Sequence, residues 1–328
     1  MRVEFLLTNI MEVGHMAPIA KALVGKGVSV TMAPAHNRHL PTEFGWSDMD
    51  AVVSGLEREG FKATGPDKTA DVVIATFPIQ NLKPFYKDAL TVRMQYGVGL
   101  VDPKSDHPMG GESDYYLVHG PFGVRTQFTM HGMPSPLIPW ERVKVIGYPR
   151  LDRFYSTQKI RNSKPALLWL PTWSVRSSID RYLPAIKRLG SNVWIRPHHC
   201  TERWEPERMR ALVDSGFFIV PKEISTAALY AASDLILADL SSGAFAEALL
   251  IGKPVIGLTN PEEHGRALID LTYLPTVTDP EYLGDVIETL RRDWRDPHFA
   301  TLRAELFTTT KGNDGMVAAR AILECMQQ

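Results

Sequence analysis

The chain has 328 residues, of which 44% are hydrophobic and 22% charged, a composition typical of folded globular proteins and a length that suits two domains. Lys and Arg total 36 against 37 Asp and Glu, so the net charge of −1 argues against a nucleic-acid partner. Two cysteines, Cys200 and Cys325, provide no disulfide framework and favour a reducing compartment.

No stretch approaches the roughly 20 apolar residues that span a bilayer, and the apolar N-terminal run is too short for a signal peptide. We therefore expect a cytoplasmic protein. Such a protein could still touch the inner face of a membrane peripherally.

The first half of the chain alternates strand and helix patterns. Val3–Leu7 is typical of a buried parallel strand, and a loop at 14–18, a helix at 19–24 and a strand at 28–32 are predicted to follow. His15 lies in that predicted loop, at the sheet edge where open α/β sheets bind ligands, although a lone loop histidine is often only solvated. Further strands are predicted at 52–53, 71–75, 91–94, 115–118 and 143–146.

A polar stretch, 158–164, is typical of a linker, and a second α/β series follows it. Strands are predicted at 166–170, 193–195, 217–220, 235–238 and 255–258, and helices at 181–189, 204–214, 244–251, 279–292 and 297–306. This alternation predicts an α/β protein of two Rossmann-like, doubly wound domains facing a cleft. We place them at 1–157 and 165–310, with a final helix in 311–328 that could cross back to the first domain.

The turn Asp239-Leu240-Ser241-Ser242-Gly243 opens a predicted helix directly after a strand. A helix start has backbone N–H groups without partners and the positive end of the helix dipole, so phosphate or diphosphate is a suitable ligand there. The alternative is that Ser241 or Ser242 only caps the helix.

Two other turns also follow predicted parallel strands: Pro171-Thr172-Trp173-Ser174 and Arg196-Pro197-His198-His199. We expect all three turns at the same edge of one sheet. Together they offer a guanidinium, imidazoles, hydroxyls and helix-start amides, which suit a diphosphate.

Metal and cofactor sites are not predicted. His198, His199 and Cys200 are adjacent in sequence, so we expect their side chains to diverge rather than converge on zinc. The sequence has no Gly-x-x-x-x-Gly-Lys-Ser/Thr loop and no well-placed Gly-x-Gly-x-x-Gly, which disfavours an NTPase or a nicotinamide enzyme. No tightly bound cofactor is expected.

From Tyr115 onward the chain resembles the CDP-glycerol glycerophosphotransferases that build teichoic acid, which have the GT-B fold. The matching segments occur in the order of that family. They are Gly147-Tyr148-Pro149-Arg150-Leu151-Asp152, Leu170-Pro171-Thr172-Trp173, Arg196-Pro197-His198, Ala232-Ser233-Asp234 through Ser242, Gly252-Lys253-Pro254, and Asp314-Gly315.

The resemblance implies that the second domain binds a nucleotide-diphosphate donor, CDP- or UDP-linked, as a substrate. It also implies a hydroxyl-bearing acceptor, whether glycan, lipid-linked or small molecule, on the first domain. His198 would contact the donor phosphates and the leaving group. The donor-binding residues implied are Thr172, Arg196, His198, Asp239, Ser241, Ser242 and Gly243.

The first half departs from that family, whose Trp-His-Gly-Thr segment carries the expected base. Here the stretch is Gln95-Tyr96-Gly97-Val98, and an unshifted tyrosine is a poor base at neutral pH. Gly14-His15-Met16-Ala17-Pro18, however, resembles the Gly-His-x-x-Pro loop of nucleotide-sugar glycosyltransferases. Tyr96 therefore marks a base that is either lost or relocated, and His15 is the candidate for the relocated base.

The leading prediction is a GT-B transferase that moves a glycerol-phosphate or glycosyl unit to a hydroxyl in cell-surface polymer or glycan synthesis. One alternative is a nucleotide-sugar glycosyltransferase with His15 as base. Another is a sugar-nucleotide epimerase or hydrolase, for which Glu12, Asp102 and Glu247 are the candidate carboxylates. A third, favoured by Tyr96, is a non-catalytic binding domain.

Overall fold

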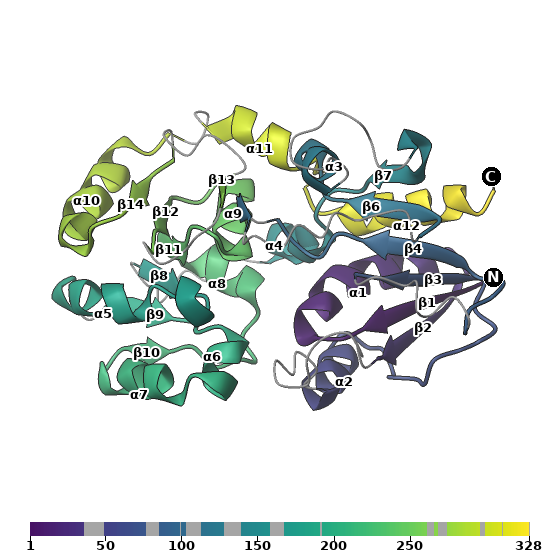
Figure 1. Ribbon diagram of the computed structural model, residues 1–328, viewed down its shortest axis with the longest axis horizontal. Coiled ribbons are helices and arrows are strands. Elements are labelled where there is room, and N and C mark those ends of the chain that lie inside the picture. The colour runs from purple at the N-terminus through teal and green to yellow at the C-terminus, as the bar shows by residue number, and fades with distance from the viewer. Residues whose placement is uncertain are drawn as a thin grey trace. The chain divides into compact units, whose positions relative to one another are not determined.

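The computed structural model describes residues 1–35, 49–76, 85–98, 100–102, 113–127, 139–157, 167–190, 192–260, 266–267, 274–295, 299–309 and 311–327. Its chain forms two compact units, each a sheet with connecting helices (Figure 1). Unit 1 comprises Met1–Gly97, His107–Tyr155 and Ala304–Gln328, and unit 2 comprises Val98–Asp106 and Ser156–Arg303. The predicted linker at 158–164 lies outside the described residues.

Unit 1 contains a six-stranded sheet in the order β2-β1-β3-β4-β6-β7, and every pairing in it is parallel. The connections reverse direction between β1 and β3, which makes that point the topological switch of the sheet. The strands are β1 (Arg2–Leu7), β2 (Ser29–Pro34), β3 (Val72–Ala75), β4 (Leu90–Met94), β6 (Tyr115–Val118) and β7 (Val143–Val145).

Unit 2 also contains a parallel six-stranded sheet, in the order β10-β9-β8-β11-β12-β14, with its switch between β8 and β11. The two parallel sheets confirm the predicted α/β fold class. The strands are β8 (Leu167–Leu170), β9 (Val193–Ile195), β10 (Phe218–Ile219), β11 (Leu235–Asp239), β12 (Val255–Leu258) and β14 (Thr276–Val277), and β5 (Val101–Asp102) pairs separately with β13 (Arg266–Ala267).

Helices connect these strands. In unit 1 they are α1 (Ile10–Val24), α2 (Met49–Arg58), α3 (Pro121–Gln127) and α12 (Asp314–Cys325). In unit 2 they are α5 (Ile179–Arg188), α6 (His199–Trp204), α7 (Pro206–Asp214), α8 (Thr226–Ala232), α9 (Gly243–Leu250) and α10 (Leu283–Asp293). Two further helices, α4 (Asp152–Ser156) and α11 (Ala300–Leu306), lie where the chain passes from one unit to the other.

The predicted loop at 14–18 is wrong, because α1 begins at Ile10 and runs through this segment with Pro18 inside it. The N-cap Asn9 accepts hydrogen bonds from the Met11 and Glu12 amides, and the Glu12 carboxylate accepts one from the Asn9 amide. This reciprocal capping box, together with burial of the helix, outweighs the helix-breaking tendency of Gly14 and Pro18. The Asn-x-x-Glu spacing was a readable signal for the true helix start.

The predicted strand at 52–53 is also wrong, since these residues lie inside α2. The buried residues of this helix are Val52, Gly55 and Leu56, and their spacing of three and four places them on one helical face. Two adjacent valines favour a strand locally, but the period of the whole segment is that of a helix.

The C-terminal helix α12 packs against α1 and completes the core of unit 1. The Asp152 carboxylate accepts hydrogen bonds from the amides of Asp314 (2.9 Å) and Gly315 (2.8 Å), which caps the start of α12. The buried Asp314 carboxylate in turn accepts the Tyr148 amide at 2.8 Å. The family-like segments Gly147–Asp152 and Asp314-Gly315 are therefore bound to each other.

Gly315 allows this contact between helices. A Cβ atom on Gly315 would lie 2.8 Å from the carbonyl carbon of Pro18 in α1. We expect Gly315→Ala to destabilise the fold by about 1–3 kcal/mol, because backbone rather than a flexible side chain must move. Denaturant unfolding measures this change.

Gly25→Ala is the matched control at the end of α1. Gly25 has φ −60°, and an added Cβ would meet its nearest atom, the Lys21 carbonyl oxygen, at 3.5 Å. We expect this control to stay within about 0.5 kcal/mol of the wild type. Equal stability of the two variants would contradict the role given to Gly315.

Candidate active site

The three predicted turns of unit 2 lie at one edge of its sheet. They follow β9, β8 and β11, which are adjacent and parallel, so their carboxyl ends point the same way. The turns after β8 and β11 flank the topological switch, the position where open α/β sheets bind ligands. The sequence-based expectation of a shared edge is thus confirmed.

Ser241 and Ser242 lead into α9, and neither hydroxyl caps it. Ser242 is the N-cap residue, yet its side chain makes no capping hydrogen bond. Both Oγ atoms are buried and have no hydrogen-bond partner among the described residues. Ser225, by contrast, caps α8 by accepting the Ala228 amide at 3.2 Å. The simple capping alternative therefore does not account for the serine pair.

Gly243, the first residue of α9, is loosely packed on the side where a Cβ atom would lie. The nearest atom to a Cβ added there would be the Val98 carbonyl oxygen, at 3.9 Å. The protein itself would thus tolerate a methyl group at this position.

Asp239 shapes the turn after β8. Its side chain is buried, and Oδ2 accepts the amides of Thr172 (2.6 Å) and Ser178 (3.2 Å). This carboxylate therefore joins the turns on both sides of the switch. Contacts of Thr172 and Asp239 with a donor remain predictions.

His198 is the N-cap of α6, and its Nδ1 accepts the Cys200 amide at 3.2 Å. Because Nδ1 supplies a lone pair, the neutral ring carries its proton on Nε2 and can donate from there. The ring also stacks on Trp173, with centroids 6.1 Å apart and planes 17° from parallel. Thr172, His198, Ser241, Ser242 and Gly243 are residues that we predict to contact donor phosphates, and we refer to this set as the phosphate cradle.

The Arg196 guanidinium is not part of this cradle. It donates to the carbonyl oxygens of Pro221, Lys222 (2.8 Å) and Ile224 (3.4 Å). These bonds hold the segment after β10 with part of the donor capacity of Arg196, and its contact with a nucleotide donor remains a prediction.

The expected divergence of His198, His199 and Cys200 is wrong. Their potential ligand atoms all lie within 4.8 Å of one another, because the His198 ring folds back over the start of α6 to accept the Cys200 amide. Burial raises the pKa of the Cys200 thiol to about 12.

In unit 1, His15 lies in the second turn of α1 and is only 1% exposed. Its ring is stacked on that of His119 at 5.4 Å and meets the ring of Tyr148 edge-on at 5.1 Å. Its Nδ1 is buried without a hydrogen-bond partner among the described residues. Burial, with smaller contributions from His119 and Arg150, lowers the pKa of His15 well below its usual value, so the ring is neutral at pH 7.

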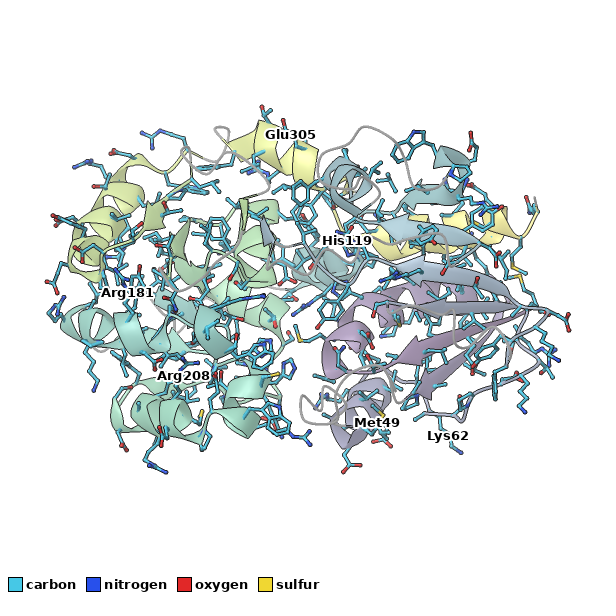
Figure 2. The ribbon with its side chains drawn as sticks, viewed as in Figure 1. Met49, Lys62, His119, Arg181, Arg208 and Glu305 are labelled. Atoms are coloured by element: carbon cyan, nitrogen blue, oxygen red, sulfur yellow. The ribbon has the colours of Figure 1, made fainter. Side chains whose placement is uncertain are left out.

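His119, which sequence reasoning missed, directly follows β6 and is fully buried (labelled in Figure 2). Its Nδ1 donates to the Gly147 carbonyl oxygen at 2.8 Å, and its amide donates to Gln95 Oε1 at 3.1 Å. Its Nε2 therefore bears a lone pair, and it has no hydrogen-bond partner among the described residues. Burial lowers the pKa of His119 to about 4. We call His15 and His119 the imidazole pair.

The sequence did contain a signal for His119. It directly follows the predicted strand at 115–118, so the rule that selected His15 applies to it equally.

Tyr96, at the position of the family histidine, lies beside this pair. Its ring centroid is 6.2 Å from that of His15, and its hydroxyl donates to Asn9 Oδ1 at 3.4 Å.

The candidate carboxylates of the epimerase alternative have structural partners. Glu12 is buried at the start of α1, where burial raises its pKa, and it accepts hydrogen bonds from Thr8, Asn9 and Thr76. These hydrogen bonds lie at the topological switch between β1 and β3, because Thr8 follows β1 and Thr76 follows β3. Glu247 accepts the Tyr230 hydroxyl at 2.8 Å. The Asp102 side chain lies outside the described residues.

Comparisons with known proteins establish the fold. No family model and no curated sequence matches the chain. Among solved structures, the wall teichoic acid polymerase TagF, soaked with CDPG, is similar over 99% of this chain and 88% of its own, with a TM-score of 0.63 and 11% identity. Anabaena HepE in complex with UDP is similar over both full chains, with a TM-score of 0.59 and 13% identity.

A UDP-N-acetylglucosamine 2-epimerase is similar over 99% of this chain and 95% of its own, with a TM-score of 0.57 and 17% identity. These full-length likenesses confirm the predicted GT-B fold. Within the described residues, no helix is both long and apolar enough to cross a membrane.

The contrast between the two N-cap serines is testable. Ser225→Ala should cost about 1 kcal/mol of stability, because it removes a capping hydrogen bond, whereas Ser242→Ala should stay within about 0.5 kcal/mol. Denaturant unfolding of both variants measures the difference. If Ser242→Ala cost as much as Ser225→Ala, its hydroxyl would be a cap rather than an available ligand group.

The lowered pKa of His119 predicts that the stability of the protein depends on pH. The pKa of His119 is about 4 in the folded chain against 6.5 for an ordinary histidine. As the pH falls from 6.5 to 4, the unfolded chain takes up this proton and the folded chain does not, so stability falls; above pH 6.5 the effect is absent. Wild type should lose stability more steeply in this window than His119→Asn, by at most about 1.4 kcal/mol per pH unit.

Urea unfolding across this pH range provides the measurement. Glu12, whose pKa is raised, contributes to the pH dependence of stability with the opposite sign. It is present in both proteins, so its contribution cancels in the comparison. Parallel stability profiles of wild type and His119→Asn would show that His119 titrates normally in the folded chain.

Proposed function

We propose that the protein is a GT-B transferase that uses a nucleotide-diphosphate donor bound at the phosphate cradle. The observation that carries this proposal is the pair of buried hydroxyls of Ser241 and Ser242 at the start of α9, which have no hydrogen-bond partner among the residues described. Hydroxyl donors, first-turn amides and the positive end of a helix dipole together match an anionic diphosphate. Their place at the topological switch of the sheet supports the same conclusion.

In the proposed reaction, His15 removes the proton of an acceptor hydroxyl while the acceptor oxygen bonds to the transferred group. The bond between that group and the leaving phosphate breaks. His198 Nε2–H, the serine hydroxyls and the α9 amides then stabilise the charge on the leaving nucleotide. His15 is neutral at pH 7, so its lone pair is available for this step.

We favour a glycerol-phosphate unit as the transferred group, with nucleoside monophosphate leaving, as for a CDP-glycerol donor. The family-like segments of the second half and the likeness to TagF support it. A glycosyl unit, with nucleoside diphosphate leaving, is the second candidate. It is supported by the Gly-His-x-x-Pro sequence at His15 and by the likeness to HepE, whose structure contains UDP.

The place of the reaction belongs to the same proposal: a cytoplasmic enzyme of cell-surface polymer or glycan synthesis. Its acceptor is a glycan, a lipid-linked molecule or a small molecule, and its contact with a membrane is peripheral.

Donor binding is tested by a thermal-shift panel of CDP, UDP, GDP, dTDP and CMP. A nucleotide that binds the folded state raises the unfolding temperature by mass action. Replacing Ser241 and Ser242 together by alanine should weaken binding about 100-fold or more, since each hydrogen bond to a charged group contributes about 1.5–3 kcal/mol. Ser225→Ala is the control. Undiminished binding to the double variant would refute the cradle.

The role of His15 is tested by His15→Ala. Loss of a general base lowers turnover by about 10²–10⁴-fold, so nucleotide release in the presence of acceptor should fall by that factor. Lys21→Ala is the control on the same helix, because Lys21 is an exposed residue paired with Glu59. Full turnover by His15→Ala would remove His15 from the mechanism.

Nucleotide release without any acceptor would favour a hydrolase or epimerase instead. Tight nucleotide binding with no turnover on any acceptor would favour the binding-domain alternative.

A further inference from the structure

The imidazole pair is held rigidly from several directions. His119 is fixed through its ring by Gly147, through its amide by Gln95, and through its carbonyl oxygen by the Thr308 amide at 3.0 Å. Close packing reinforces these bonds, because a Cβ atom on Gly120 would lie 2.4 Å from the Leu306 carbonyl oxygen. The position of the His119 ring is therefore set by its surroundings.

The residue that covers both rings is also fixed. Tyr148 packs against His15, against His119 at 4.5 Å and against Phe307 at 5.2 Å between ring centroids. Its amide is bound by Asp314, whose own amide is bound by Asp152. The family-like segments thus support the imidazole pair and are not only a means of attaching α12.

Among the residues that the structure describes, two buried polar atoms of this site have no hydrogen-bond partner: His119 Nε2 and His15 Nδ1. Buried polar atoms without partners are costly, and their presence in a rigid site indicates a missing partner. The tautomer of His119 is fixed by its bond to Gly147, so the group that meets Nε2 has to be a hydrogen-bond donor.

The chemistry of the missing partner follows from charge. An ionised carboxylate or phosphate oxygen has no proton to give to Nε2. A cation is disfavoured by burial and by the Arg150 guanidinium, which acts on His15. A hydroxyl fits both atoms, since it donates to His119 Nε2 and can donate to or accept from His15 Nδ1 in either tautomer. Two such atoms in one ring pair suit a ligand with two hydroxyls.

We propose that the imidazole pair binds a neutral polyhydroxyl group, such as a glycerol or sugar unit, with one hydroxyl on His119 Nε2 and a second on His15 Nδ1. Identifying this group with the acceptor rests on the proposed function, but the binding itself does not. The reacting hydroxyl is then the one on His15. His119 contacts the neighbouring hydroxyl and so selects acceptors that carry one.

The test uses the full chain labelled with ¹⁵N-histidine. Before any ligand is added, His119 should show a protonated Nδ1 and an unprotonated Nε2 at pH 7. Titration with glycerol should shift the Nε2 signal of His119 and the Nδ1 signal of His15, whereas n-propanol, with one hydroxyl, should bind at least tenfold more weakly. If neither signal moves with glycerol, or both alcohols act alike, a buried water accounts for the site and the proposal fails.

His119→Asn provides the matched variant, because its amide can still donate to Gly147 while the Nε2 acceptor is lost. Glycerol affinity, read from the His15 signal, should fall about tenfold; unchanged affinity would overturn the proposal. If this variant does not fold, the wild-type titration alone decides. The nucleotide panel run on the same sample separates the two hypotheses: glycerol binding without nucleotide binding would refute the cradle only, and the reverse would refute only this inference.

Discussion

Buried carboxylates that accept backbone N–H groups hold the functional loops of both units in place. Asp239 binds the amides of Thr172 and Ser178 across the switch of the unit 2 sheet. Glu12 binds the amide of Asn9 at the switch of the unit 1 sheet. A hydrogen bond from a backbone amide to a carboxylate oxygen is stronger in a buried site than in water, so these few bonds fix the loops around them.

The two sheets use their switch points differently. In unit 1 the Glu12 carboxylate and the hydroxyls of Thr8 and Thr76 satisfy one another, which leaves little for a ligand there. In unit 2 the Asp239 carboxylate accepts backbone amides, and the hydroxyls of Ser241 and Ser242 have no hydrogen-bond partner within the described part of the chain. The two switch points therefore differ in how many of their described polar side chains are bonded to one another.

Sequence reasoning predicted the parallel sheets well, because short apolar runs between Gly- and Pro-containing turns have few other readings. It placed the turns after β8, β9 and β11 at one edge correctly for the same reason. It was incomplete where tertiary bonds decide. The sequence does not show that the Arg196 guanidinium donates to carbonyl oxygens about 25 residues away, at 221–224. His119 directly follows a predicted strand, but the sequence does not show its contact with the ring of His15, more than 100 residues earlier.

The placement of α12 affects how the chain can fold during synthesis. Unit 1 begins at Met1, yet its core includes Ala318 and Ile322, which follow all of unit 2 in sequence. The ribosome therefore releases a complete unit 2 while unit 1 still exposes the apolar face of α1 that α12 will cover. Contacts of such long sequence separation form slowly, so a nascent chain carries this uncovered surface until α12 has been synthesised.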